Sequence, residues 1–227
     1  MKPELRIGVI DSGHAAHQPA NAGRRFFLTP RGLEEGELQE DALGHGSAVV
    51  EAIRKRAPAA RLCVAQVFDQ RGVTSALQVV AALYWLLEQG VCLINLSLGL
   101  RQDRQLLRLA CAEAAARGVL LCASSPAQGE PVYPASYPGV LRVTGDARCS
   151  ADQWSWLDTA QADFAACVRG CGPGQAGASL GCAALSGHIA AYLQTHPGAS
   201  HPQIRQWLQA HAAYHGPERR HLSCQRS

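Results

Sequence analysis

The sequence lacks the charge imbalance, the basic runs and the long apolar segments that mark several classes of protein. Its 227 residues carry 21 Lys and Arg against 18 Asp and Glu, and no basic run interleaved with aromatic residues appears. Nucleic acid is therefore not an expected partner. No segment approaches membrane-spanning length, and the N-terminal stretch MKPELRIGVIDSG reaches an acidic residue before any apolar run of signal-peptide length. These absences predict a cytoplasmic protein without a membrane partner.

Cysteine pairs at zinc-site spacing are also missing, although cysteine itself is not scarce. The chain has nine cysteines, an odd number, and most lie in apolar surroundings, as Cys63 and Cys122 do. We interpret them as reduced thiols of the interior rather than as disulfide partners or zinc ligands. Cys167 and Cys171 flank a glycine-rich turn, and a bridge or a metal site between them is the less favoured alternative.

Short apolar runs alternate with amphipathic segments along most of the chain. This alternation predicts an α/β fold, a doubly wound and mostly parallel sheet with helices on both faces, whose functional residues lie at the carboxyl ends of strands. We expect one domain over residues 1–227. The predicted strands cover residues 5–10, 60–68, 91–98, 119–123 and 140–144, and the predicted helices cover residues 48–57, 75–88, 102–117, 178–195 and 202–212.

Three regions carry a weaker pattern. Between residues 14 and 39, only residues 26–28 are expected to form a strand. Residues 154–168 are expected to add an antiparallel edge to the sheet. Residues 214–227 are polar, and we expect them to form an exposed tail.

One predicted helix combines small apolar residues with a serine in its first turn. Residues 177–198 read GASLGCAALSGHIAAYLQTHPG, and the apolar residues recur at steps of three and four. Backbone N–H groups in a first helical turn lack helical partners, and the helix dipole stabilises a negative charge there. Ser179 is therefore well placed to act as a nucleophile. The alternative, for Ser179 taken alone, is a helix N-cap.

Two other element ends carry candidate catalytic side chains. Asp11 follows the apolar run LRIGVI at the expected carboxyl end of a strand, where an Asx turn is the alternative. His45 stands between Gly44 and Gly46 at a predicted helix start. The flanking glycines allow the backbone and other side chains to approach the imidazole closely, which is less typical of a structural histidine.

Asp11, His45 and Ser179 follow one another in the order of the catalytic residues of subtilisin. The local sequences VIDSG, GHGS and GASLGCAALSG resemble the three signature blocks of subtilisin-like serine proteases, the S8 type. NLSLG, YPASYPGVLRVTG and HPGASHPQIRQWL resemble the family's substrate-binding strand, the segment after its oxyanion loop and its C-terminal helix pair. The resemblance covers nearly the whole chain and implies a subtilisin-like fold and peptide-bond hydrolysis.

The resemblance also implies roles for individual residues. Ser179 would attack the peptide carbonyl, His45 would accept and return the proton, and Asp11 would orient His45. The substrate would lie in the cleft as an added strand. Residues 122–126 would form one wall of the pocket for the side chain that precedes the scissile bond. The substrate-binding residues implied in this way are Ser97, Leu98, Gly99 and Ser124.

The sequence departs from the family at the oxyanion site. Where the family has an asparagine that donates to the oxyanion, CASSPAQGE places Ser125 or Pro126. A proline side chain donates nothing, and the loss of such a donor typically costs about 10²–10³ in rate. Either Ser124, Ser125 or Gln128 replaces the asparagine, or the backbone N–H of Ser179 acts alone in a slower enzyme.

Length is a second departure. The chain begins almost at the first strand, so we expect no pro-segment, and it is short between His45 and Cys63, where many relatives insert a calcium-binding loop. No acidic cluster replaces that loop, so no metal and no other cofactor is predicted. These features favour limited processing of one intracellular protein or peptide, for which we expect a leader-bearing small subunit.

Other functions remain open. One is a catalytically weak or silent protein of the same fold that binds a peptide or chaperones a subunit. Another is an esterase, because residues 177–181 match the GxSxG motif of α/β-hydrolases, although Glu218 is the only carboxylate side chain after Ser179. Cys182 could be considered as a thiol nucleophile, but we favour a small core residue. His188 could be considered as a second base, but we favour a histidine on the face of the helix.

Overall fold

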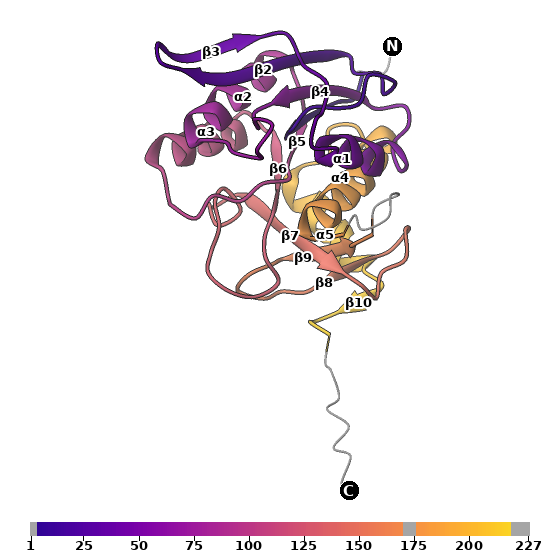
Figure 1. Cartoon of the computed structure of the whole chain (residues 1–227). Helices are drawn as coiled ribbons and strands as arrows, with labels where there is room; N and C mark the ends of the chain where they lie inside the picture. Colours follow the sequence, from indigo (N-terminus) through magenta and orange to yellow (C-terminus); the bar gives the residue numbers. More distant parts are fainter. Residues whose placement is uncertain (1–3, 170–175, 219–227) are drawn as a thin grey trace, which may run out of the picture.

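One sheet of ten strands runs through the described part of the chain, residues 4–169 and 176–218 of this computed structural model (Figure 1). The strands are, in chain order, β1 (Arg6–Asp11), β2 (Ala22–Thr29), β3 (Gly32–Gly36), β4 (Arg61–Gln66), β5 (Leu93–Leu96), β6 (Leu120–Ser124), β7 (Val140–Asp146), β8 (Trp154–Trp156), β9 (Phe164–Cys167) and β10 (Tyr214–His215). Across the sheet they are arranged in the order β10-β8-β9-β7-β6-β5-β1-β4-β2-β3. The helices are α1 (His45–Arg54), α2 (Ala76–Glu88), α3 (Gln105–Ala116), α4 (Ala178–Thr195) and α5 (His201–Ala210). None of these described helices is both long and apolar enough to span a membrane.

Helices cover both faces of the sheet. β1 lies near its centre and pairs in parallel with β4 on one side and β5 on the other. Because side chains alternate across a strand, Ile7 and Val9 of β1 pack in the core that contains α1, α4 and α5, whereas Ile10 packs in the core that contains α2 and α3. Burial on both faces explains why the interior strands are continuous apolar runs. The predicted doubly wound, mostly parallel α/β fold is confirmed.

The largest difference from the predicted elements is an antiparallel hairpin at one edge of the sheet. The apolar pattern predicts a strand only over residues 26–28, whereas β2 and β3 pair over five positions, from Arg25 with Gly36 to Thr29 with Gly32. Of the residues in these two strands, only Phe26 is buried. An edge hairpin relies on backbone pairing more than on side-chain burial, so its sequence lacks the apolar alternation that marks a half-buried strand.

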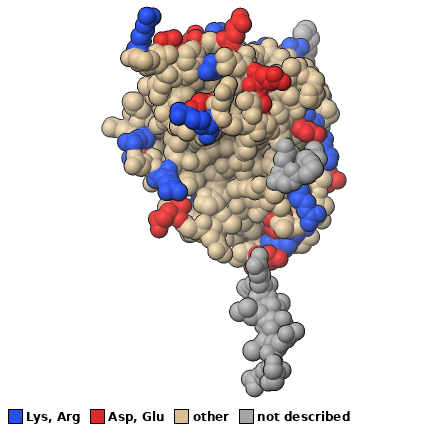
Figure 2. Space-filling view, viewed as in Figure 1, with Lys and Arg blue, Asp and Glu red and all other residues tan. Residues whose placement is uncertain are grey.

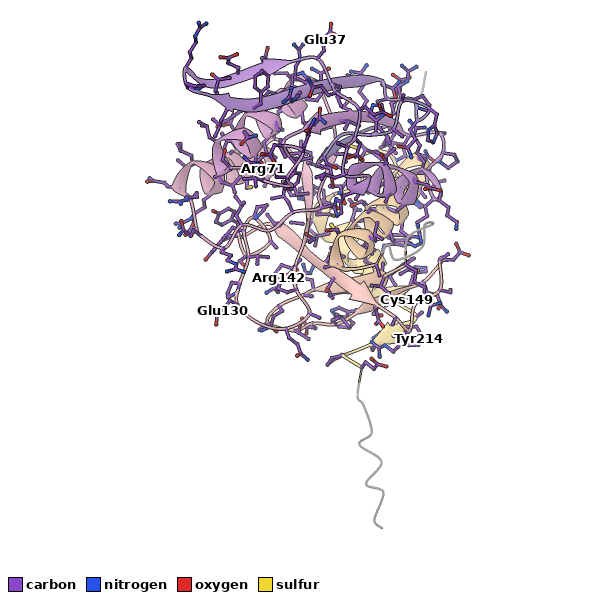
Figure 3. All side chains as sticks on the ribbon, viewed as in Figure 1. Glu37, Arg71, Glu130, Arg142, Cys149 and Tyr214 are labelled. Atoms are coloured by element: carbon purple, nitrogen blue, oxygen red, sulfur yellow. The ribbon has the colours of Figure 1, made fainter. Side chains whose placement is uncertain are left out.

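The opposite edge uses residues that the sequence pattern assigns to an exposed tail. Tyr214 and His215 form β10, which pairs in parallel with β8, so the predicted tail is wrong at its start. Figure 3 labels Tyr214 beside Cys149 at this corner of the molecule. β8 itself pairs antiparallel with β9, as expected for residues 154–168. A strand of two residues held by backbone bonds leaves no periodic signal in the sequence, and residues 219–227 lie outside the described part of the chain.

The cysteines of the described residues are unpaired. All seven of them are free, and six are buried, whereas Cys92 is partly exposed. This agrees with the interpretation of most cysteines as thiols of the interior. Cys171, the partner considered for Cys167, lies outside the described residues.

Candidate active site

The carboxyl ends of neighbouring parallel strands bring the candidate residues to one edge of the sheet. Asp11 is the last residue of β1, and Ser97 directly follows the last residue of β5. β1 and β5 are in register through Ile10 and Leu96, so Asp11 and Ser97 come next on adjacent strands, about 5 Å apart. This is the edge at which function is expected in an α/β sheet.

Asp11 is a buried carboxylate that binds the candidate histidine. Its side chain has no exposed surface. Oδ1 accepts hydrogen bonds from the backbone N–H of Ser12 and from Nδ1 of His45, both at 2.7 Å. Since a carboxylate only accepts hydrogen bonds, Nδ1 of His45 carries a proton, and in the neutral imidazole Nε2 therefore keeps its lone pair. The imidazole is thereby held in the tautomer that can act as a base.

Glycines on both sides of His45 allow the approach to Asp11. His45 is the first residue of α1, and Gly44 before it has a φ of 70°, in the left-handed region that favours glycine. A Cβ on Gly46 would collide with the carbonyl oxygen of Gly13, in the turn that follows Asp11. The helix and the turn therefore meet backbone to backbone. This contact brings the imidazole within hydrogen-bonding distance of the buried carboxylate.

The electrostatic setting favours the protonated imidazole. The hydrogen bond to Asp11 raises the pKa of His45, burial opposes this effect, and the negative charges of Asp11 and Asp41 add to the rise. The imidazole is 41% exposed, so solvent screens part of these interactions. A raised pKa stabilises the imidazolium ion that general-base catalysis produces.

Asp41, which is not among the residues predicted from the sequence, organises the segment around His45. Its Oδ1 accepts a hydrogen bond from the N–H of Gly44 at 3.0 Å, and its Oδ2 accepts from the N–H and the hydroxyl of Ser47 at 2.8 and 2.6 Å. Burial raises the pKa of Asp41, but the hydrogen bonds to its carboxylate outweigh this effect and lower it. The available signal was an aspartate shortly before a helix start, where such residues commonly cap backbone N–H groups.

Ser12 connects Asp41 to the catalytic candidates. Its hydroxyl lies 2.8 Å from Oδ1 of Asp41 and 3.2 Å from Oδ1 of Asp11, and it accepts a hydrogen bond from the N–H of Gly46 at 2.9 Å. A hydroxyl has one proton, so the shorter distance favours donation to Asp41. Ser12 and Asp41 together fasten the start of α1 to the turn after β1.

Ser179 lies in the first turn of α4 and is bound to the segment after β5. Its hydroxyl donates to the carbonyl oxygen of Ser97 at 3.2 Å, and the hydroxyl of Ser97 donates to the carbonyl oxygen of Ser179 at 3.1 Å. Behind this pair, Asn95 donates to Ser97 Oγ at 2.8 Å and accepts from Ser186 of α4 at 3.0 Å. Ser179 is thus anchored to the residue that neighbours Asp11 on the adjacent strand. All three predicted catalytic residues lie at the same edge of the sheet.

The hydroxyls considered for the oxyanion site are engaged elsewhere. Ser124 Oγ donates to the carbonyl oxygen of Leu98 at 3.3 Å, and Ser125 Oγ donates to the carbonyl oxygen of Gln161 at 2.6 Å. Gln128 is exposed. Each hydroxyl has a single proton to donate, so neither serine offers a free donor in this arrangement. The Ser124 bond is the longer and weaker of the two.

Cys182 and His188 occupy interior positions on α4 rather than reactive ones. Cys182 is fully buried, and burial raises the pKa of its thiol well above the ordinary value, so the reactive thiolate is suppressed. Burial and the charge of Arg56 lower the pKa of His188 to about 4, and Arg56 Nε donates to its Nε2 at 3.0 Å. His188 also packs against Trp154, with ring centroids 4.9 Å apart. Both residues therefore stabilise the packing around α4.

Charged side chains are unevenly distributed over one face of the molecule (Figure 2). On the face seen in Figure 2, charged side chains lie around the margin and over the upper part, and the middle is uncharged and hollowed. Figure 3 marks Arg71 and Glu130, which follow the carboxyl ends of β4 and β6, well apart on this face. In the described residues, no three His, Cys, Asp or Glu side chains gather so that they could hold a metal ion.

A large cavity lies away from the carboxyl ends of the strands, where the candidate catalytic residues are. Its volume is about 940 Å³, and Leu5, Cys92 and Leu120 line it where β1, β5 and β6 begin. Function in open α/β sheets is expected at the opposite, carboxyl ends of the strands. The position of this cavity therefore separates it from Asp11, His45 and Ser179.

Known proteins share this sequence pattern and fold. Residues 3–223 match the Subtilase family, Peptidase_S8. The minor extracellular protease Epr of Bacillus subtilis (strain 168) is 28% identical in an alignment 152 positions long, which covers 62% of this chain and only 23% of Epr. Subtilisin of Bacillus pumilus is 24% identical in an alignment 238 positions long, gaps included, which covers 93% of this chain and 85% of that protein. Among solved structures, a lanthipeptide protease is similar with a TM-score of 0.65 and 17% identity, over 89% of this chain and 78% of that one.

Proposed function

Because the chain belongs to the subtilase family, we propose that it is a serine endopeptidase in which Asp11, His45 and Ser179 form the catalytic triad. The observation that carries the proposal is the 2.7 Å hydrogen bond between Asp11 Oδ1 and His45 Nδ1, at the edge of the sheet where α4 begins. That bond leaves the lone pair of Nε2 available to a serine hydroxyl, as triad chemistry requires.

In the proposed reaction, the substrate backbone lies along residues 97–99 as an added strand. The hydroxyl of Ser179, which donates to Ser97 in the free protein, redirects its proton to Nε2 of His45 while its oxygen attacks the peptide carbonyl carbon. Asp11 stabilises the imidazolium ion, which then protonates the leaving amine. A water molecule attacks the acyl-enzyme by the same route, releasing the second product and restoring the Ser179 hydroxyl.

We propose that the backbone N–H of Ser179 is the main donor to the oxyanion, because the hydroxyls of Ser124 and Ser125 are engaged with carbonyl groups. The amino-terminal end of α4 adds a favourable dipole at this position. A site with one backbone donor and no committed side-chain donor is expected to be slower than that of a degradative protease by about 10²–10³. Such an enzyme suits the cleavage of a single positioned substrate.

A serine-directed fluorophosphonate tests the triad. We expect the wild-type protein to be labelled at Ser179, as located by mass spectrometry of its peptides. Labelling should disappear in Ser179→Ala and should fall steeply in His45→Ala, whereas Ser200→Ala, at the start of α5, should label like the wild type. A folded protein that never labels would contradict the proposed enzyme.

That result would favour the second candidate function, a peptide-binding protein or chaperone with the same fold. The engaged hydroxyls of Ser124 and Ser125 favour this alternative, because they leave the oxyanion without a side-chain donor. The two functions differ in what Ser179→Ala does to a bound peptide. An endopeptidase loses cleavage and keeps binding, whereas a binding protein is unchanged.

We further propose that the substrate is a leader-bearing small subunit processed in the cytoplasm. The sequence resembles the maturation protease of bacterial quinohemoprotein amine dehydrogenase, which removes the leader peptide from the γ subunit after that subunit has been internally cross-linked. Incubation with this leader-bearing subunit, followed by mass spectrometry, tests the proposal. We expect the wild type to remove the leader and Ser179→Ala to leave it in place. If the wild type reacts with the fluorophosphonate but leaves the leader intact, the proposed substrate is wrong and the proposed peptidase function is not affected.

A further inference from the structure

The pocket expected to receive the side chain before the scissile bond is bounded by two segments that leave adjacent strands. Residues 97–99 follow β5, and residues 124–126 stand at the end of β6, with which β5 pairs in parallel. The hydroxyl of Ser124 donates to the carbonyl oxygen of Leu98 at 3.3 Å, and this bond ties the two segments together. The two walls therefore start side by side at the carbonyl group that Ser179 contacts.

Val132 lies against one of these walls. A Cβ placed on Gly99 would stand 3.2 Å from both Cβ and Cγ2 of Val132, so the valine side chain packs directly against the glycine backbone. One additional carbon atom at Gly99 would already be crowded there. Val132 is partly buried and packs on the hydrophobic core that includes Leu98. Its side chain is therefore packed against the wall at Gly99.

Hydrogen bonds hold the segment around Val132 in place. The next residue, Tyr133, exchanges two backbone hydrogen bonds with Leu100, at 2.7 and 2.8 Å. The carbonyl oxygen of Val132 accepts from the N–H of Ser136 at 3.0 Å. The ring of Tyr133 also packs on that of Tyr137, with centroids 5.0 Å apart. A withdrawal of Val132 from the wall would break these contacts.

The bounding residues carry no charge. Residues 97–99 are Ser, Leu and Gly, residues 124–126 are Ser, Ser and Pro, and Val132 is apolar. A buried charge without a partner is costly, so an ionised substrate side chain would lose its hydration here without gaining a counter-charge.

We propose that Val132 restricts this pocket to small uncharged side chains, so that the enzyme cleaves after Gly, Ala or Ser and rejects Leu, Phe and charged residues. The inference rests on the proposed peptidase function and names the class of cleavage site. A misfit of a single methylene in a binding pocket changes kcat/KM by about 10–200-fold. A phenyl ring exceeds alanine by far more than one methylene, so we expect discrimination of at least about 100-fold between Ala and Phe.

Three serine-directed probes test the proposal on the full chain. Two are peptidyl diphenyl phosphonates that differ only in carrying Ala or Phe at the position before the reactive group, and the third is a simple alkyl fluorophosphonate without such a side chain. The rate of labelling of Ser179 is measured for each. The wild type should react with the Ala probe at least about 100-fold faster than with the Phe probe.

The substitution Val132→Ala should open the pocket and raise the rate with the Phe probe by about 10-fold or more, while the rate with the Ala probe stays within a few-fold. Val80→Ala, a truncation at another partly buried valine of the same core, should leave the ratio of the two rates unchanged. Wild-type reactivity of each variant with the fluorophosphonate shows that it is folded.

The outcomes separate this inference from the proposed function. Three results would overturn the inference alone, provided that the wild type reacts with the fluorophosphonate. They are equal rates with the two peptidyl probes, a faster reaction with the Phe probe, and no reaction with either peptidyl probe. The same holds if Val132→Ala leaves the ratio unchanged. A folded wild type that reacts with no probe overturns the proposed function and this inference with it.

Discussion

At the scale of single residues, Asp41 shows how a carboxylate outside the proposed triad can position the segment that carries the imidazole of His45. It accepts hydrogen bonds from three backbone N–H groups and two hydroxyls, all in the turn after β1 or around the start of α1. Its charge also contributes to the raised pKa of His45. Asp41 is therefore a positioning residue with both a structural and an electrostatic effect.

The substitution Asp41→Asn should separate these two effects. Loss of the negative charge lowers the pKa of His45, so the acid limb of the pH profile of kcat/KM should move to lower pH, because His45 stays neutral to a lower pH. The side-chain NH₂ group that this substitution introduces would also face N–H and O–H donors that now bind the carboxylate. Because these donors would lose their acceptor, the free energy of unfolding should fall by roughly 1–3 kcal/mol. The measurements are a pH profile of peptide cleavage and urea denaturation.

Asp69 offers a matched control for that substitution. It accepts backbone hydrogen bonds in an exposed turn much as Asp41 does, from the N–H groups of Arg71 and Val73. Asp69→Asn should leave the acid limb in place. An acid limb that does not move in Asp41→Asn would show that the charge of Asp41 does not reach His45.

The oxyanion site gives a second test at this scale. Because the hydroxyl of Ser125 donates to Gln161 at 2.6 Å, Ser125→Ala should lower the free energy of unfolding by about 0.5–1.5 kcal/mol and change kcat by only a few-fold. A true oxyanion donor would instead cost about 10²–10³ in kcat. Steady-state kinetics of Ser125→Ala and Ser124→Ala, compared with the wild type, distinguish the two roles, and a loss of that size in either variant would identify the missing donor.

At the scale of secondary-structure elements, α4 is positioned by a close backbone contact with β7. A Cβ on Gly181, two residues after Ser179, would collide with the backbone of Thr144 and Gly145. The small residues of this helix therefore allow it to lie directly on the sheet. Helix α1 meets the turn after β1 in the same way, through Gly46 and Gly13.

Gly181→Ala should therefore displace the start of α4. Overpacking a dense core costs typically about 1–3 kcal/mol, and here the obstructing atoms belong to the backbone, so a value at the upper end is expected. Urea denaturation and fluorophosphonate labelling of Ser179 should both show the loss. Gly36→Ala is the control, since its Cβ would meet only Phe27 at an ordinary 3.5 Å. Equal stability of the two variants would contradict the tight contact.

At the scale of the whole molecule, the interior around α4 links parts of the chain that are far apart in sequence. Arg56, after α1, donates to His188 of α4 and to the carbonyl oxygen of Ala151, while Trp154 of β8 packs on His188 and on Trp207 of α5. His188 is neutral in this cluster, because burial and the charge of Arg56 lower its pKa to about 4. The cluster therefore depends on pH.

We expect the free energy of unfolding to fall as the pH drops from 6.5 to about 4. In this window the unfolded chain binds a proton at His188 and the folded chain does not, so protonation favours unfolding by up to about 1.4 kcal/mol per pH unit. His188→Gln keeps an acceptor for Arg56 and should flatten this dependence in urea denaturation at several pH values. His211→Gln, at an exposed histidine, should not, and an unchanged slope in His188→Gln would contradict the assignment.

The sequence by itself determined the features that depend on local pattern. Apolar runs predict the interior strands because these strands are buried on both faces, and the order of Asp11, His45 and Ser179 between recognisable glycine-containing blocks predicts the site. The strand ends and helix starts that carry these three residues are local properties. They follow from where the apolar periodicity begins and stops.

Only the tertiary structure decided which groups meet across the sheet. The edge hairpin and β10 are held by backbone pairing, which leaves no periodicity to detect. The bond of Ser12 with Asp41, the bonds of Ser124 with Leu98 and of Ser125 with Gln161, and the contact of Val132 with Gly99 join residues 26 to 36 positions apart, and they depend on strand register. Register aligns segments in space by interactions summed over the whole sheet, so a local sequence pattern cannot report which hydroxyl faces which carbonyl.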